Sequence, residues 1–149
     1  MPTYIPIEII AIEADGFHLM LQVKLNGRDA RMLIDTGASR SVFDKERIAL
    51  LFNGGMPEME ENLQKSTGLG TSDMPSEAFY LETFCIGELV IRHYPAVVLD
   101  MSHVNSSYDM LGLPPIDGVL GSDILQKYGA RIDYRSRILR LNLRGVKTI

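Results

Sequence analysis

The sequence is poor in the residue types that would mark several other classes of protein. It has a single cysteine, Cys85, so no disulfide can form within the chain, and a reducing compartment is the simpler expectation. The formal net charge of −4 at pH 7 argues against a nucleic-acid-binding protein, whose binding face would be basic. The histidines at positions 18, 93 and 103 show no metal-ligand spacing. We therefore expect no cofactor, no metal ion and no nucleic-acid partner.

Long apolar runs are also absent, and no stretch approaches the length needed to span a membrane. The N-terminus has no basic region ahead of an apolar core, because Glu8 and Glu13 bracket the apolar residues 9–12. These absences predict a cytoplasmic protein without a signal peptide or a membrane partner. The length of 149 residues and the 46% hydrophobic content suit one globular domain, which we expect to cover residues 1–149.

Short β-forming runs separated by turn signals predict an all-β fold. Asp15-Gly16 and Asn26-Gly27 are the strongest signals, because both dipeptides suit the type I′ turn of a tight hairpin. In the last expected strand, leucines alternate with polar residues along the sequence, which is the pattern of a strand with one buried face. The expected strands are residues 5–14, 17–25, 28–34, 79–84, 88–99, 131–134 and 138–143.

Two short helices interrupt the predicted strands. Asp44 is expected to cap the first, and Ser122 is expected to cap the second, over residues 123–128. Residues 58–64 fit either a solvated helix or an exposed strand edge, since several of them are acidic. Residues 105–115 are expected to form a loop.

The most informative motif is Leu-Ile-Asp-Thr-Gly-Ala-Ser, residues 33–39. It places the Asp35 carboxylate where an apolar strand breaks into a tight turn. Gly37 has no Cβ, so backbone N–H groups can approach the Asp35 oxygens, and the Thr36 hydroxyl can lock the turn to a neighbour. An ordinary strand-to-loop turn would use the same residue types, because they favour turns.

A second motif lies far downstream, where Val119 and Leu120 precede Gly121. An apolar-apolar-Gly motif that follows an upstream Asp-Thr-Gly resembles the pattern of retropepsin-like aspartic proteases, particularly the small single-domain bacterial members. The resemblance covers residues 15–143. It implies a closed β-barrel of hairpins with one or two short helices, in which Val119, Leu120 and Gly121 pack beneath the catalytic loop.

Aspartic proteases need two carboxylates that share one proton, because like charges about 3 Å apart cannot both ionise cheaply. The chain holds one Asp-Thr-Gly. The resemblance therefore implies that the catalytic Asp35 residues of two copies meet on a two-fold axis, and that a homodimer cleaves a polypeptide substrate. Thr36, Gly37 and Ala38 would complete the active-site loop.

Residues 66–72 lie between the two motifs, where the family has its flap. Gly68, Leu69, Gly70 and Thr71 are the expected flap and substrate-binding residues. Glycines at a hairpin tip allow a backbone that closes over a substrate and opens again. The alternative is a plain flexible loop.

Asp117 is the rival for the second carboxylate within one chain. It precedes Gly118, so a turn or cap role is the favoured interpretation. Five other aspartates lack the apolar-Asp-hydroxyl-Gly setting and are expected to be caps, turns and surface charges, namely Asp44, Asp100, Asp109, Asp123 and Asp133. A different class also stays open: a peptide-binding or assembly module with the same fold and little or no proteolytic activity.

Two departures from the family pattern concern Ser122 and the termini, and a separate comparison with pepsin-type enzymes concerns Ala38. Viral retropepsins follow the apolar-apolar-Gly motif with an Arg that pairs with an acidic residue near the active-site loop, and here Ser122 stands in that place. Ala38 stands where pepsin-type enzymes usually carry a Ser or Thr that donates a hydrogen bond to a catalytic carboxylate. The termini interlock between subunits in viral enzymes, and the sequence leaves open whether they do so here.

Overall fold

The computed structural model describes residues 1–52, 60–62 and 76–145. The four flap candidates at positions 68–71 lie outside the described residues. The strands are β1 (Pro2–Pro6), β2 (Glu8–Glu13), β3 (Gly16–Leu25), β4 (Arg28–Ile34), β5 (Val42–Asp44), β6 (Glu60–Asn62), β7 (Ser76–Ile86), β8 (Leu89–Leu99), β9 (Gly118–Leu120), β10 (Arg131–Asp133) and β11 (Ile138–Asn142). The helices are α1 (Lys45–Phe52), α2 (Ser102–Met110) and α3 (Ser122–Lys127).

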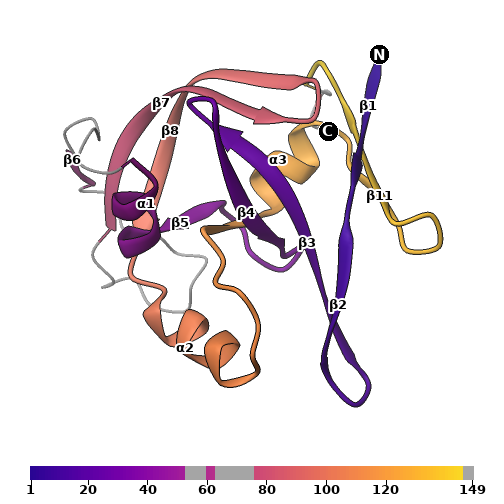
Figure 1. Cartoon of the computed structure of the whole chain (residues 1–149). Helices are drawn as coiled ribbons and strands as arrows, with labels where there is room; N and C mark the ends of the chain where they lie inside the picture. Colours follow the sequence, from indigo (N-terminus) through magenta and orange to yellow (C-terminus); the bar gives the residue numbers. More distant parts are fainter. Residues whose placement is uncertain (53–59, 63–75, 146–149) are drawn as a thin grey trace.

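Six strands close into a barrel, which confirms the predicted fold class. Neighbouring strands follow the order β3, β4, β9, β5, β8 and β7, and β7 pairs back onto β3 at Leu25 and Phe84. Strands β2 and β6 extend the sheet at its two ends (Figure 1). Large apolar side chains such as Phe43, Leu81 and Phe84 are fully buried and fill the interior.

The two predicted N-terminal hairpins form, but the turn predicted for the first is wrong. The chain turns at Ala14 and Asp15, Gly16 already belongs to β3, and neither Asp15 nor Gly16 has the positive φ of a type I′ turn. Strand β2 pairs with β3, and β3 pairs with β4 in an unbroken antiparallel register. Asn26 and Gly27 have φ angles of +50° and +81°, the left-handed conformation that a type I′ turn requires of both central residues. The local turn chemistry therefore decides the turn between β3 and β4, whereas it does not fix the turn between β2 and β3.

The single strand predicted for residues 5–14 is wrong, because the structure divides it at Ile7. Strand β1 pairs with β11 in a separate three-stranded sheet of order β1, β11, β10, whereas β2 pairs with β3. Pro6 has no N–H to donate to a ladder, which favours a strand end at this position. The Ile7 N–H donates instead to the Arg137 carbonyl at 3.0 Å.

The loop predicted for residues 105–115 is also wrong, because residues 102–110 form helix α2. Ser and Asn residues make its intrinsic helix propensity modest, so tertiary contacts decide the outcome. Tyr108 is buried in an apolar cluster, and the Asn105 amide bonds both the N–H and the carbonyl of Ile116. The described residues thus hold three helices, one more than the upper limit of the prediction.

The two predicted helix caps have different outcomes. Asp44 caps α1 as expected, since its Oδ2 accepts a hydrogen bond from the Arg47 N–H at 2.9 Å. Ser122 does not cap α3. The N-cap residue is Gly121, no side chain caps that helix, and the Ser122 N–H donates to the Ala38 carbonyl at 2.7 Å.

Strand β9 runs between β4 and β5 and is hydrogen-bonded to both. It is parallel to β4, with Leu120 opposite Ile34, and antiparallel to β5. Leu120 is fully buried in the barrel core. A Cβ on Gly121 would lie 2.8 Å from the Ala38 carbonyl oxygen and 2.8 Å from the Arg40 carbonyl carbon, which only a backbone shift could relieve.

We expect Leu120→Ala to lower the free energy of unfolding by about 2–5 kcal/mol through loss of burial and a residual cavity. Gly121→Val should cost more, because its added atoms meet backbone rather than flexible side chains. Denaturant unfolding of both variants tests this. Gly16→Ala is the control, because a Cβ there meets no atom within 4 Å. Wild-type stability in both test variants would contradict the packing described for β9.

Candidate active site

Asp35 lies directly after β4, where the chain leaves the barrel wall for the loop of residues 35–41. The backbone N–H of Asp35 donates to the Leu120 carbonyl at 3.0 Å, which ties the loop entry to β9. Its side-chain Oδ1 accepts a hydrogen bond from the Gly37 N–H at 2.9 Å. Asp35, Thr36 and Gly37 are all exposed in the isolated chain. The carboxylate is thus oriented by its own loop and accessible from outside.

Behind these exposed residues, the loop turns inward at Ala38. This side chain is buried in an apolar cluster that also contains Val42 of β5 and Val119 of β9. Helix α2 adds Tyr108 to the same cluster, and the Tyr108 hydroxyl lies 2.6 Å from Nδ1 of His18. The active-site loop therefore rests on an apolar base to which β5, β9 and α2 contribute.

The loop ends at Ser41, which is fully buried. The Ser41 Oγ donates to Asp123 Oδ1 at 2.7 Å, and the Ser41 N–H donates to the same oxygen at 2.9 Å. The Gly121 N–H in turn donates to Ser41 Oγ at 2.8 Å.

Burial, and after it the nearby Asp123 carboxylate, raises the pKa of the Tyr94 hydroxyl above its ordinary value.

The sequence does not predict the contact between Asp123 and Ser41. The position of Asp123 at the start of a short helix indicates a cap or a surface charge, and nothing local connects it to Ser41, which precedes it by 82 positions. The signal that could have found it is indirect. A buried serine at the end of the loop needs a partner, and Asp117 and Asp123 are the two carboxylates that lie two positions before and after the apolar-apolar-Gly motif.

Asp117 is engaged on both carboxylate oxygens. Oδ2 accepts a hydrogen bond from the Arg31 N–H at 2.8 Å, and Oδ1 pairs with Arg47 Nε at 3.0 Å. The side chain is buried, so these partners offset the cost of removing a charge from water. Asp117 thus joins β4 to α1, a structural role that differs in detail from the expected turn or cap.

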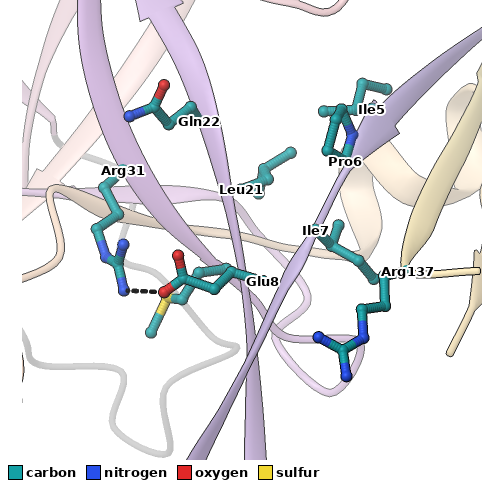
Figure 2. A pocket seen from close by; sticks show the side chains of 9 residues that line it. Ile5, Pro6, Ile7, Glu8, Leu21, Gln22, Arg31 and Arg137 are labelled. Atoms are coloured by element: carbon teal, nitrogen blue, oxygen red, sulfur yellow. Dashed lines mark hydrogen bonds and ion pairs between the residues drawn. The ribbon is translucent and has the colours of Figure 1, made fainter.

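A cavity of about 420 Å³ lies at the junction of β1 and β2. Figure 2 shows Glu8 and Arg31 reaching toward one another across it, with 3.2 Å between Oε1 and Nη2, while Arg137 comes from the turn before β11. Asp35 is not among its lining residues. This cavity is therefore separate from the loop that carries the candidate catalytic residue.

A second cavity, of about 340 Å³, borders the loop itself. Thr36 lines it together with Ser122, with Leu125 and Gln126 of α3, and with Gly129, Ala130 and Ile132. Gln126 is exposed, and Ile132 belongs to β10, the outer strand of the three-stranded sheet. We call this cavity the α3–β10 groove. Thr36, one of its lining residues, is exposed.

The described residues include no helix long and apolar enough to cross a membrane. They also include no group of three or more His, Cys, Asp or Glu side chains placed to hold a metal ion.

Comparisons with known proteins agree with this geometry. The sequence model of the family described as aspartyl protease matches residues 21–124, which include both the Asp35 loop and β9. No curated protein sequence matches the chain.

Two solved structures are similar over nearly their whole length. One is a retropepsin-like aspartic protease from Rickettsia conorii, with a TM-score of 0.55 and 21% identity over 98% of this chain and 95% of that one. The other is the retroviral protease-like domain of Ddi1 from Leishmania major, with a TM-score of 0.55 and 18% identity over 89% of this chain and 94% of that one. These structures share the fold, and because the family model covers more than half of the sequence, the chain belongs to the aspartyl protease family.

Proposed function

We propose that this protein is a homodimeric aspartic endopeptidase in which Asp35 is the catalytic residue of each subunit. The observation that carries the proposal is the setting of Asp35, which directly follows β4, accepts a hydrogen bond from Gly37 and is exposed. The chain holds one Asp-Thr-Gly motif, and Asp117 is committed to Arg31 and Arg47. The second carboxylate would therefore come from a second copy.

In this mechanism one Asp35 is ionised and its counterpart is protonated. The ionised carboxylate removes a proton from a water molecule, whose oxygen attacks the carbonyl carbon of the peptide. The protonated carboxyl donates its proton to the carbonyl oxygen, which gives a tetrahedral diol. The diol collapses as the C–N bond breaks: the carboxyl that took the water proton gives it to the leaving nitrogen, and the other carboxylate takes a hydroxyl proton from the diol. The pair thereby returns to its starting protonation state. Thr36, Gly37 and Ala38 would hold the carboxylate in place during these steps.

The position of the α3–β10 groove beside Thr36 supports the proposal of a dimer. Two Asp35 carboxylates that share a proton must approach to about 3 Å, so the neighbouring Thr36 of each copy would lie close to the two-fold axis. Gln126 and Ile132 line the same groove and would be covered by the second copy. The terminal strands β1 and β11 pair within one chain, so an exchange of termini is not needed to complete the sheet.

The flap assignment for Gly68, Leu69, Gly70 and Thr71 stays a prediction. Its support is the position of the segment between β6 and β7, which pair antiparallel with Asn62 opposite Ser76. The polypeptide substrate and the cytoplasmic location are also part of the proposal.

We expect Asp35→Asn to lower kcat/KM by about 100- to 10,000-fold, because an amide cannot act as the general base. Fold and dimer should persist, since the amide keeps the shape of the side chain. Cleavage is measured by incubating the purified protein with a diverse peptide mixture and mapping new termini by mass spectrometry. Asp29→Asn is the matched control, because Asp29 is an exposed aspartate on β4, the strand that Asp35 follows.

Full turnover by Asp35→Asn would exclude Asp35 as the catalytic residue. A wild-type protein that binds peptides in this mixture without cleaving them would favour the peptide-binding or assembly module instead.

We expect Gln126→Arg to raise the dimer dissociation constant about tenfold or more, the equivalent of roughly 1.4 kcal/mol. Two added positive charges would face each other in the α3–β10 groove near the two-fold axis. Analytical ultracentrifugation gives the dissociation constant, and peptide cleavage should fall with it on dilution. Val90→Arg adds the same side chain at an exposed position of β8 outside the groove. If Gln126→Arg and Val90→Arg dimerise equally well, the groove is not the interface.

We expect Ala38→Ser to shift both limbs of the pH profile of kcat/KM downward by about one pH unit. A serine hydroxyl can donate to an ionised catalytic carboxylate and favour that form, whereas Ala38 cannot. The wild type should therefore keep its singly protonated pair to higher pH than the serine variant. Ala11→Ser, at an exposed position of β2, is the control. An unmoved alkaline limb would show that Ala38 does not set the working range.

A further inference from the structure

We propose that Ser41 and Asp123 are positioning residues, which hold the loop of residues 35–41 against α3 and thereby place Asp35 for catalysis. This inference rests on the proposed function, but the contact itself belongs to the isolated chain. The two ends of the loop are held by different means. At the start of the loop, a backbone hydrogen bond from the Asp35 N–H to the Leu120 carbonyl holds the chain to β9. At the end of the loop, the chain is held by a hydrogen bond between the side chains of Ser41 and Asp123.

Ser41 is a buried polar group whose hydrogen bonds join three segments. Its hydroxyl donates to Asp123 and accepts from the Gly121 N–H, so one oxygen connects the loop to the end of β9 and to α3. Removing this hydroxyl would leave the Gly121 N–H without that acceptor in a buried place, which costs more than the loss of an exposed bond. The contact therefore favours one arrangement of the loop exit.

Asp123 supplies the other half of the tie from the first turn of α3. One carboxylate oxygen, Oδ1, accepts two hydrogen bonds from Ser41, one from its N–H at 2.9 Å and one from its hydroxyl at 2.7 Å. A carboxylate in the first turn also interacts favourably with the helix dipole. No side chain caps α3, and so this contact fixes the start of the helix to the loop rather than to its own backbone.

The same tie connects the active-site loop to the proposed interface. Ser122, between Gly121 and Asp123, donates its N–H to the Ala38 carbonyl and lines the α3–β10 groove with Thr36. A displaced α3 would therefore move Thr36 and its neighbour Asp35. Misplacement of a reacting group by about 1 Å can cost 100-fold in rate, so the expected loss is in kcat.

The test compares Ser41→Ala and Asp123→Ala with Asp123→Asn, which keeps an oxygen acceptor at Oδ1. The Ala variants should lose about 10- to 100-fold in kcat while KM changes less than about threefold, and Asp123→Asn should retain most of the rate. Asp123 is exposed, so its variants should fold even where Ser41→Ala does not. Matched controls are Asp100→Ala and Ser107→Ala, which remove a carboxylate and a hydroxyl from hydrogen bonds at α2.

Amide hydrogen exchange separates failure of this inference from failure of the proposed function. In Ser41→Ala and Asp123→Ala, the Asp35 and Gly121 amides should exchange at least about tenfold faster, whereas the control variants should leave them unchanged. Faster exchange in a protein that cleaves no peptide would refute the protease function, and with it a role in catalysis, but would show that Ser41 and Asp123 hold the loop against α3. Unchanged exchange, unchanged kcat in Asp123→Ala, or an equal loss in Asp123→Asn would overturn the positioning role.

Discussion

The insertion of β9 between β4 and β5 is the constraint on which the rest of the structure depends. The strand is hydrogen-bonded on both edges, and a glycine stands at each end because the neighbouring backbone leaves no room for a side chain. A Cβ on Gly118 would lie 2.6 Å from the Val42 carbonyl oxygen, and one on Gly121 would lie 2.8 Å from that of Ala38. The loop of Asp35 must therefore leave β4 and return to β5 around a strand that cannot move away.

This insertion also explains why the apolar pair of the second motif is continuous rather than alternating. Leu120 faces the main barrel core, whereas Val119 faces the smaller cluster that contains Ala38. A strand buried on both faces has no polar side, so successive apolar residues are expected. The two cores meet at β9, and the active-site loop is held at their boundary.

The parts of the fold that follow from the sequence are those decided by local chemistry. Asn26-Gly27 dictates its turn through backbone conformation, and Asp44 caps α1 with its own side chain. The predictions that are wrong involve partners distant in sequence. Tyr108 stabilises α2 through burial, and the Ser122 N–H donates a hydrogen bond to the Ala38 carbonyl, while the Ser122 side chain does not cap α3. At the candidate site, the Asp-Thr-Gly motif is visible in the sequence. The Ser41–Asp123 contact is not, because it forms across 82 positions.

The aspartates around the loop differ in how many other segments of the chain their carboxylates contact. Asp44, Asp117 and Asp123 each accept two hydrogen bonds or ion pairs from other segments, so their charges are committed to holding α1, β4 and the loop exit in place. Asp35 accepts its hydrogen bond from Gly37, two residues away, and is exposed. The proposed mechanism needs a carboxylate that its surroundings orient without engaging both of its oxygens. Among these four aspartates Asp35 has that setting, because the hydrogen bond that it accepts comes from its own loop.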